Sequence, residues 1–462
     1  MHIATLKHRD GTQVNKGAID KFKSEFKGQA LLSGDEGYEA ARHIWNASID
    51  KHPGLIAQCA SASDVIRAVK FARANNLLVA VRSGGHNVAG RSLCDDGIVI
   101  DLAAMKRVSV EADSRKVHVQ AGALLGDLDR ETHLHGLAVP AGVVPKTGIA
   151  GLTLGGGVGW LVRKYGMTID NLLSCEVVTA NGELVTASEE TNADLFWGLR
   201  GGGGNFGIVT SFVFRAHPVK TVLGGLLLYP RDDATAVLRN YRAFMTTAPE
   251  ELTAYAGLIS TPDGVPVVGM IVCYCGELAE GERVLAPLRK FGTPILDAIE
   301  PMPFPVMQSL VGNSFPDNAH NYWKSTFVKD LSDDVIDVLI EHGNRMQSPL
   351  SAVVLEFYGG APTRVGHADT AFAHRAAEYN IGITGQWLDA AESDQHIGWT
   401  RALFDALQPH SSGGYLANFV SDEGTDQAKA SFGGNYARLA ELKSKYDPTN
   451  LFSLNQNIKP VR

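Results

Sequence analysis

Apolar and polar residues follow two different patterns along this chain, and the change falls near residue 219. Before that point, short apolar runs are separated by many glycine turns, and several runs alternate with period two, as half-buried strands do. Asn181-Gly182 separates two such runs and predicts a hairpin with a type I′ turn. We expect helices at 61–75 and 124–134, and strands at 77–81, 97–101, 108–110, 117–119, 175–180, 183–186 and 208–214.

After residue 219 the segments are longer and more regular. We expect strands at 222–229, 253–259, 265–273, 352–358 and 382–388, helices at 234–247, 280–290, 333–346, 368–379 and 395–407, and a last helix at 426–446. This order fits one antiparallel sheet with helices on one face, so the predicted fold class is α+β.

Composition and charge narrow the function classes. A chain of 462 residues is long for one core, so two domains are expected. The net charge of −8, without a basic block, argues against nucleic acid as a partner. No stretch approaches the ~20 apolar residues that span a bilayer, and no signal peptide is evident, so we expect a cytoplasmic protein without a membrane partner.

Cysteine and histidine residues do not predict a metal site. The cysteines are few and lie mostly in apolar runs, as buried thiols of a reducing compartment do. Cys273 and Cys275 would share one strand face without a second pair of ligands, and His133 and His135 are expected to be exposed at a helix end. We also expect His374 and His396 to be solvated on helices.

A glycine turn carries the first chemical signal. The run Val81-Arg82-Ser83-Gly84-Gly85-His86-Asn87 directly follows an apolar strand. Glycine lets the backbone approach a ligand closely and leaves the N–H groups uncovered, so this turn can face a diphosphate. A histidine at its tip would then lie beside the ligand.

A second glycine pattern resembles a dinucleotide motif but lacks its context. Gly202, Gly204 and Gly207 satisfy G-x-G-x-x-G. That motif needs a helix N-terminus after the glycines to hold the pyrophosphate, whereas here a predicted strand follows at 208–214. An NAD-linked dehydrogenase is therefore disfavoured.

Four sequence blocks together resemble one family. They are the turn at 81–87, the stretch 140–171 with Gly155-Gly156-Gly157, the stretch 195–207, and the C-terminal stretch 446–458 with Tyr446-Asp447-Pro448. In this order they are similar to the berberine-bridge-enzyme-like branch of the p-cresol methylhydroxylase / vanillyl-alcohol oxidase superfamily. The resemblance implies an FAD-binding domain formed by residues 1–219 and 413–462, with a substrate-binding domain, 220–412, inserted between them.

The resemblance also implies how the cofactor is held. It places a covalent bond between His86 and the 8α-methyl carbon of FAD. Val144 stands where many relatives carry a cysteine with a second covalent bond, and Leu152 replaces a histidine common in those members, so we expect the single histidyl bond of the 6-hydroxy-D-nicotine oxidase type. The expected FAD contacts are Arg82, Ser83, Gly84, Gly85, His86, Asn87, Val144, Thr147, Gly148, Gly151, Leu154, Gly157, Gly207, Ile208, Asn455 and Asn457.

The candidate substrate residues come from three segments. Tyr322 and Lys324 flank a tryptophan, and Glu356 lies within an apolar strand where burial would raise its pKa. Tyr415 and Asn418 lie in a segment similar to the family's Tyr-x-Asn-Phe, with one extra residue between them. Each has a simpler interpretation, since an aromatic pair is often core and a strand glutamate can face solvent.

The implied reaction is hydride transfer from a C–H bond next to an amine or hydroxyl of a small molecule to flavin N5. Oxygen would then be reduced to hydrogen peroxide, with Thr147 at the position that gates oxygen. Glu356 is the best candidate base and Tyr415 the second. The alternatives are a carbohydrate or phenolic-alcohol oxidase or dehydrogenase of the same fold, and a flavoprotein without turnover. Homodimers are common among relatives, and no feature of this sequence demonstrates one.

Overall fold

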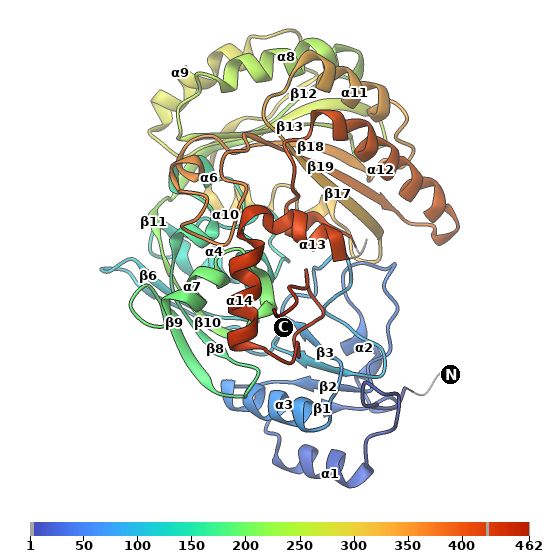
Figure 1. Cartoon of the computed structure of the whole chain (residues 1–462). Helices are drawn as coiled ribbons and strands as arrows, with labels where there is room; N and C mark the ends of the chain where they lie inside the picture. The colour runs from blue at the N-terminus through green and yellow to red at the C-terminus, as the bar shows by residue number, and fades with distance from the viewer. Residues whose placement is uncertain (1–3, 422–424, 462) are drawn as a thin grey trace.

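The computed structural model describes residues 4–421 and 425–461. The lower part of the molecule in Figure 1 begins with a four-stranded sheet in the order β1-β2-β4-β3. Its strands are β1 (Gln29–Leu31), β2 (Leu55–Gln58), β4 (Ile98–Asp101) and β3 (Val79–Arg82). β2, β4 and β3 are parallel, and helix α3 (Ala62–Ala74) lies between β2 and β3 in the chain. The predicted helix and strands of this region are confirmed.

A second, five-stranded sheet completes the lower part. It is antiparallel and has the order β5 (Val108–Glu111), β6 (Lys116–Gln120), β10 (Ile208–Arg215), β8 (Leu172–Val178) and β9 (Leu184–Ser188). A short pair, β7 (Leu137–Ala138) and β11 (His217–Pro218), lies beside it. The predicted hairpin of β8 and β9 forms here, and the strands expected at 108–110 and 117–119 pair as β5 and β6.

The turn between β8 and β9 differs from the prediction. Of Asn181 and Gly182, only Gly182 has a positive φ, 72°. A type I′ turn needs a positive φ at both central residues, so the turn type is wrong. Instead, the Thr179 N–H donates to the Glu183 carbonyl, and the Thr179 carbonyl accepts from the Gly182 N–H, both at 2.9 Å. These two hydrogen bonds close a three-residue loop in which the glycine has the left-handed conformation.

The upper part of the molecule is one eight-stranded antiparallel sheet under helices. Its strands follow the order β15-β12-β14-β13-β18-β19-β17, with β16 paired to β12. They are β12 (Thr221–Pro230), β13 (Leu252–Ser260), β14 (Pro266–Tyr274), β15 (Leu296–Asp297), β16 (Glu300–Pro303), β17 (His320–Val328), β18 (Ala352–Phe357) and β19 (Tyr379–Trp387). The α+β class is thereby confirmed.

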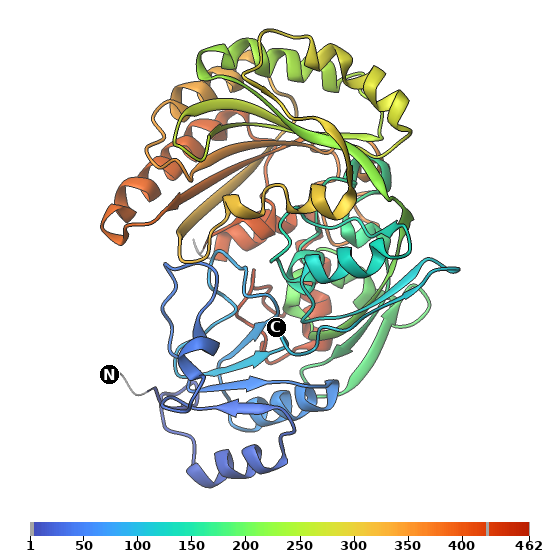
Figure 2. The same cartoon turned by 180° about the vertical axis from the view of Figure 1, so that it is seen from behind.

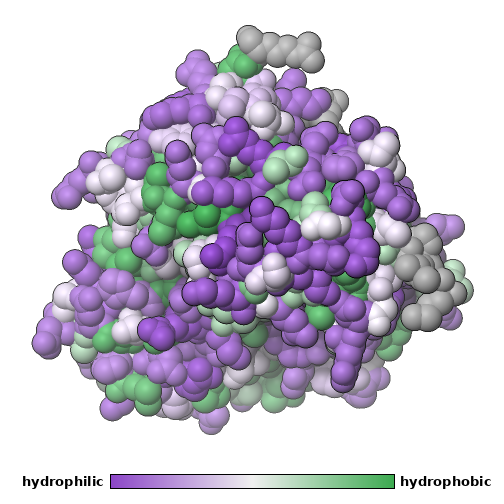
Figure 3. All heavy atoms as spheres, turned by 90° about the horizontal axis from the view of Figure 1, so that it is seen from below, coloured by the Kyte–Doolittle hydropathy of each residue, from purple (hydrophilic) through white to green (hydrophobic). Residues whose placement is uncertain are grey.

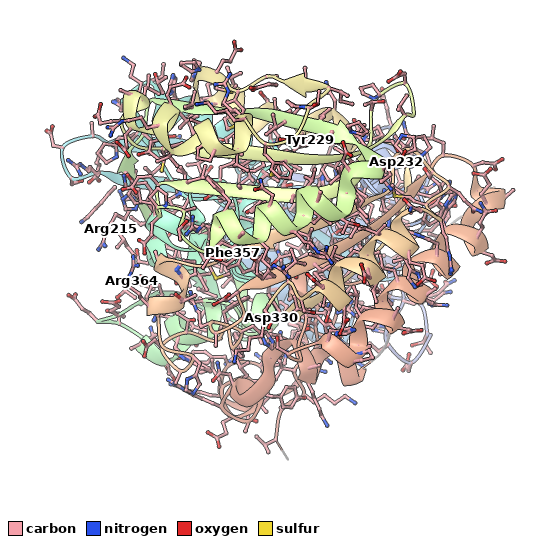
Figure 4. All side chains as sticks on the ribbon, turned by 90° about the horizontal axis from the view of Figure 1, so that it is seen from above. Arg215, Tyr229, Asp232, Asp330, Phe357 and Arg364 are labelled. Atoms are coloured by element: carbon pink, nitrogen blue, oxygen red, sulfur yellow. The ribbon has the colours of Figure 1, made fainter. Side chains whose placement is uncertain are left out.

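Four long helices cover one face of this sheet, as Figures 1 and 4 show. They are α8 (Ala234–Met245), α9 (Leu278–Arg289), α11 (Asp333–Gly343) and α12 (Ser393–Leu407). Leu223, Leu227 and Tyr229 of β12 pack under them, in one apolar cluster with the helices. Because neighbouring side chains of a strand point to opposite faces, Leu226 and Leu228 face the lower part of the molecule.

The two ends of the chain meet in the lower part. The helix α14 (Tyr436–Tyr446) lies there beside α7 (Ala193–Leu199), below the upper sheet in Figure 1, and Figure 2 shows the same arrangement of the chain from behind. One apolar cluster contains residues from Leu6 to Ala216 together with residues from Phe432 to Ile458. The other α-helices are α1 (Lys16–Glu25), α2 (Tyr38–Arg42), α4 (Leu125–His133), α5 (Ile149–Leu154), α6 (Val162–Tyr165), α10 (Phe304–Ser309) and α13 (Thr425–Phe432).

Two predicted helices are corrected. The segment 368–379 is not helical, because its backbone bonds to other segments: the N–H groups of Ala371 and Phe372 donate to the carbonyls of Trp197 and Arg200. The Arg375 side chain also forms a bidentate pair with Asp170. The helix expected at 426–446 is interrupted at Gly433, whose φ is +47°. α13 and α14 are therefore separate.

The predicted surroundings of two histidines are also wrong. His374 lies in the irregular segment, and its ring stacks on Phe327 at 5.0 Å. His396 does lie on α12, but its side chain is buried against Trp387. Helical periodicity alone could not show that these positions face a neighbouring element.

Figure 3 shows one face of the surface, on which hydrophilic residues predominate and apolar ones form small groups. In the described part of the chain, no helix is long and apolar enough to cross a membrane, and no group of three or more His, Cys, Asp or Glu side chains could hold a metal ion. The five cysteines are free thiols.

Candidate functional site

A cavity of about 1100 Å³ lies between the upper sheet and the lower part. Its lower wall consists of the turn after β3, the glycine-rich segment 142–158, the loop before β10 and the C-terminal segment 452–456. Its upper wall is the helix-free face of the eight-stranded sheet. The four sequence blocks singled out above therefore meet at one place.

The turn after β3 presents an unusual row of backbone donors. In the described structure, none of the N–H groups of residues 83–87 donates to another protein atom. The turn is packed so closely that a Cβ on Gly84 would lie 2.4 Å from the Gly148 nitrogen, and Gly85 has a φ of +67°. Uncovered backbone N–H groups on a glycine turn suit an anionic ligand such as a diphosphate.

His86 lies on this turn and lines the cavity. Its ring stacks on Trp45 at 4.2 Å between centroids, nearly parallel at 10°. The Nε2 atom is buried without a hydrogen-bond partner. Burial lowers the pKa of His86 to about 4, so the ring is neutral near pH 7 and keeps a lone pair for bonding to a cofactor carbon.

Glycines also permit close packing on the opposite side of the cavity. A Cβ on Gly155, at the end of α5, would lie 2.3 Å from Oδ1 of Asn418, which belongs to the 3₁₀ turn η8 (Ala417–Phe419). Asn418 donates to the Gly151 carbonyl at 3.2 Å, and its Oδ1 is buried without a partner. The predicted residue Asn418 therefore lies in the cavity wall, beside α5.

The C-terminal segment closes the cofactor side. Asn455 lines the cavity and donates to the Gly204 carbonyl at 3.3 Å. Gly204 belongs to η2 (Gly203–Asn205), a short 3₁₀ turn that leads into β10. No long helix starts after these glycines, which confirms that a Rossmann-type pyrophosphate site is not formed here.

Most of the predicted FAD contacts line the cavity. Those that do are Ser83, Gly84, Gly85, His86, Asn87, Val144, Thr147, Gly148, Gly151, Leu154, Gly207, Ile208 and Asn455. Arg82, Gly157 and Asn457 are not among its lining residues. Arg82 donates to the Ala41 carbonyl, and a Cβ on Gly157 would collide with Thr168, so both support the wall from behind.

Glu356 brings a carboxyl group to the upper wall. It is 5% exposed, and its Oε2 accepts hydrogen bonds from the Tyr358 hydroxyl at 2.5 Å and from Asn380 at 2.8 Å. Burial raises the pKa of Glu356, and the two hydrogen bonds oppose this shift. The group is thus a buried carboxyl whose charged form has two donors.

Tyr255 is the functional candidate that sequence reasoning missed. It is the cross-strand neighbour of Glu356, lines the cavity, and its buried hydroxyl has no hydrogen-bond partner. Its ring lies 4.9 Å from that of Trp160, whose Nε1 is also buried without a partner. Tyr255 stands in a mainly apolar strand, but only strand pairing shows that it lies opposite Glu356.

Three predicted substrate residues are not brought to the cavity. Tyr322 and Lys324 point to the helix side of β17, where the Arg401 Nε donates to the Tyr322 hydroxyl and Lys324 lies 3.9 Å above the Phe404 ring. Tyr415 also packs near Phe404. A strand alternates faces, so the residue between them, Trp323, lines the cavity instead.

Comparison with known proteins agrees with this geometry. Residues 53–188 match the family described as FAD binding domain, and residues 417–459 match berberine and berberine like. The chain is 33% identical to an FAD-linked oxidoreductase of Dictyostelium discoideum, over 96% of this chain and 97% of that one. It is 32% identical to (R)-6-hydroxynicotine oxidase of Paenarthrobacter nicotinovorans, over 94% and 97%.

The fold comparison gives the same result. The structure of 6-hydroxy-D-nicotine oxidase from Arthrobacter nicotinovorans superposes with a TM-score of 0.87 at 30% identity, covering 94% of this chain and 98% of that one. A berberine-bridge-like protein of Physcomitrella patens, at 24% identity, also has a TM-score of 0.87, over 96% and 99%. The latter likeness concerns the fold alone.

Proposed function

Because the chain belongs to the berberine-bridge-like family of FAD-linked oxidoreductases, we propose that it is an oxidase of a small amine or alcohol, with FAD bonded covalently to His86 alone. The observation that carries this proposal is the His86 turn: five unpaired N–H donors beside a neutral, unpartnered histidine nitrogen. Bound FAD would accept a hydride from the substrate and pass the electrons to oxygen, which gives hydrogen peroxide.

The residues present fit this cofactor. Residues 83–87 would hold its diphosphate through backbone N–H groups, and Trp45 would fix the orientation of the His86 ring. Val144 lines the cavity without a sulfur atom, which supports a single covalent bond. Thr147, on the same wall, is the residue that we place beside the path of oxygen.

Glu356 and Tyr255 would act on the substrate. A carboxylate that receives hydrogen bonds from Tyr358 and Asn380 can anchor a cationic amine or take a proton from a hydroxyl group. The unpaired Tyr255 hydroxyl can hydrogen-bond to the same substrate atom. We keep amine and alcohol open, and infer a cytoplasmic enzyme whose partners are a small molecule and oxygen.

A carbohydrate substrate is the second candidate, because a carbohydrate oxidase from Microdochium nivale shares the fold. The upper wall of this cavity is mainly apolar along β12, β13 and β14. Sugar recognition needs many hydrogen-bonding side chains, so this wall favours a more apolar molecule.

Acid precipitation of the purified protein tests the covalent bond. Yellow colour should stay in the pellet, and it should move to the supernatant in His86→Ala but not in His135→Ala, a histidine at the exposed end of α4. Colour in the supernatant of the unchanged protein would remove the covalent bond. A peroxide screen with amines and alcohols then tests turnover, and peroxide release with none of them would contradict the oxidase.

The kinetics of Glu356→Gln separate its two roles. A base would show mainly a fall in kcat, typically ~10²–10⁴-fold. An anchor for a cation would show mainly a rise in KM. Unchanged kinetics would remove Glu356 from the site.

A further inference from the structure

The cavity extends well beyond Glu356 along the upper sheet. On β13, the residues that share the face of Tyr255 are Gly257 and Ile259, and both line the cavity. The four residue steps from Tyr255 to Ile259 span about 13 Å at the usual rise of ~3.3 Å per residue. This extension is much longer than a single amine or hydroxyl group requires.

The walls of this extension are apolar. Val267, Gly269 and Ile271 of β14 and Leu226 and Leu228 of β12 line it. Among all the described lining residues of the cavity, only Arg91 and Glu356 belong to the Lys, Arg, Asp and Glu group. Arg91 donates to the Asn455 carbonyl on the cofactor side, so no charged side chain lies on the wall beyond Glu356.

The side chains of Leu228 and Ile259 pack closely over Gly269, which has none of its own. A Cβ on Gly269 would lie 2.7 Å from Cδ2 of Leu228 and 3.4 Å from Cδ1 of Ile259. A larger side chain there would therefore press on both walls. At the far end, the lining continues to Pro262 and Pro349, which are exposed, so the extension reaches the surface at these two loops.

We propose that this extension, which we call the apolar channel (Gly257, Ile259, Val267, Gly269, Leu226 and Leu228), binds an extended hydrocarbon arm of the substrate. The inference rests on the proposed function in one respect: the group to be oxidised lies beside Glu356 and Tyr255. The arm then runs along β13 toward Pro262. The substrate class is an amphipathic amine or alcohol, with one polar end and an unbranched or flat apolar body.

Binding of alkyltrimethylammonium ions to the holoprotein tests the channel without turnover, because a quaternary nitrogen has no lone pair to expel a hydride. Isothermal titration with ethyl to octyl chains should show tighter binding with length, by up to about fourfold per CH₂ group. Ile259→Trp should abolish this dependence on length, and Ile295→Trp, at a position 56% exposed on the same domain, should keep it.

A second variant protects the test against misfolding. Ile259→Ser leaves the channel open but makes its wall polar, so it should flatten the dependence on length while the melting temperature stays close to that of Ile295→Trp. Affinity independent of length in the unchanged protein, or a length dependence in both Ile259 variants as steep as in the unchanged protein, would overturn the channel. Peroxide release from the matching n-alkylamines is measured separately. Length-dependent binding without peroxide would leave the channel standing and contradict the oxidase.

Discussion

Lys443 and Asp447 form an ion pair of 2.7 Å in which neither side chain has any exposed surface. Lys443 also donates to the carbonyls of Asn205 and Phe452, at 2.8 and 2.9 Å, and Asp447 accepts from the backbone N–H groups of Leu451 and Phe452. The ion pair therefore joins the 3₁₀ turn before β10 to the C-terminal segment. Residues of this turn and of this segment line the cavity. Lys443 is a positioning residue for the cofactor side of the site.

Lys443→Met should leave the Asp447 carboxylate buried without its partner. Breaking one side of a buried pair costs about 3–5 kcal/mol, so we expect the free energy of unfolding in urea to fall by that amount. Lys445→Met is the matched control, because Lys445 pairs with Asp194 at the surface, with 60% of its side chain exposed. That change should cost less than about 1 kcal/mol. Equal losses would show that the buried pair has no special role.

Asp129 should make stability depend on pH. It is buried at the contact of α4 with α10, where Gln308 donates to it at 3.1 Å. Burial raises the pKa of Asp129 to about 7 from its ordinary 3.8, so the folded state holds a proton that the unfolded chain has lost. The stability that this group contributes is greatest below about pH 4. It decreases as the pH rises from 4 to 7, by up to ~1.4 kcal/mol per pH unit.

Asp129→Asn should remove this slope. The amide oxygen can still accept from Gln308, but it carries no titrating proton. Urea unfolding between pH 4 and pH 7 measures the difference from the unchanged protein, with Asp113→Asn in the exposed turn between β5 and β6 as the control. Parallel pH profiles for all three proteins would contradict the assignment.

Tyr358→Phe should shift the pH profile of activity. The Tyr358 hydroxyl stabilises the charged form of Glu356, so its removal should raise the pKa of Glu356 further. If the carboxylate is the active form, activity rises with pH through that pKa. The acidic limb of kcat/KM should then move to higher pH in the variant. A limb that moves to lower pH, or an unchanged profile, would argue against the carboxylate as the active form.

Gly155→Ala should displace Asn418 from the cavity wall. The new methyl group would lie 2.3 Å from the Asn418 Oδ1, so this side chain must move. Misplacement of a site group by about 1 Å can cost ~100-fold in rate, and we expect kcat/KM to fall by 10- to 100-fold. Gly398→Ala on α12, where a Cβ has open space, is the control and should leave kcat/KM unchanged. An unaffected Gly155→Ala enzyme would show that Asn418 has no part in the reaction.

The glycine turn at His86, the hairpins and most long elements could be predicted from the sequence, because each depends on local rules. The positive φ at position 85 favours glycine there. The alternation of apolar and polar residues along β8 and β9 is visible without knowledge of any distant segment. The same holds for the rejection of a Rossmann site, since the strand after Gly207 is visible in its own apolar run. The family motifs added the identity of the expected cofactor and the expected order of the FAD-binding and substrate-binding segments along the chain.

The tertiary structure alone decided which side chains share the cavity. The local sequence pattern could not show which face of β17 lines the cavity. The structure places Trp323 there, whereas its neighbours Tyr322 and Lys324 point to the helix side. Tyr255 became a candidate only through its pairing with Glu356 across two strands. The sequence by itself determined where most turns fall, because this depends on short-range properties of the chain, and its family motifs indicated the cofactor class. The shape of the substrate side depends on contacts between strands far apart in sequence, which only the folded sheet brings together.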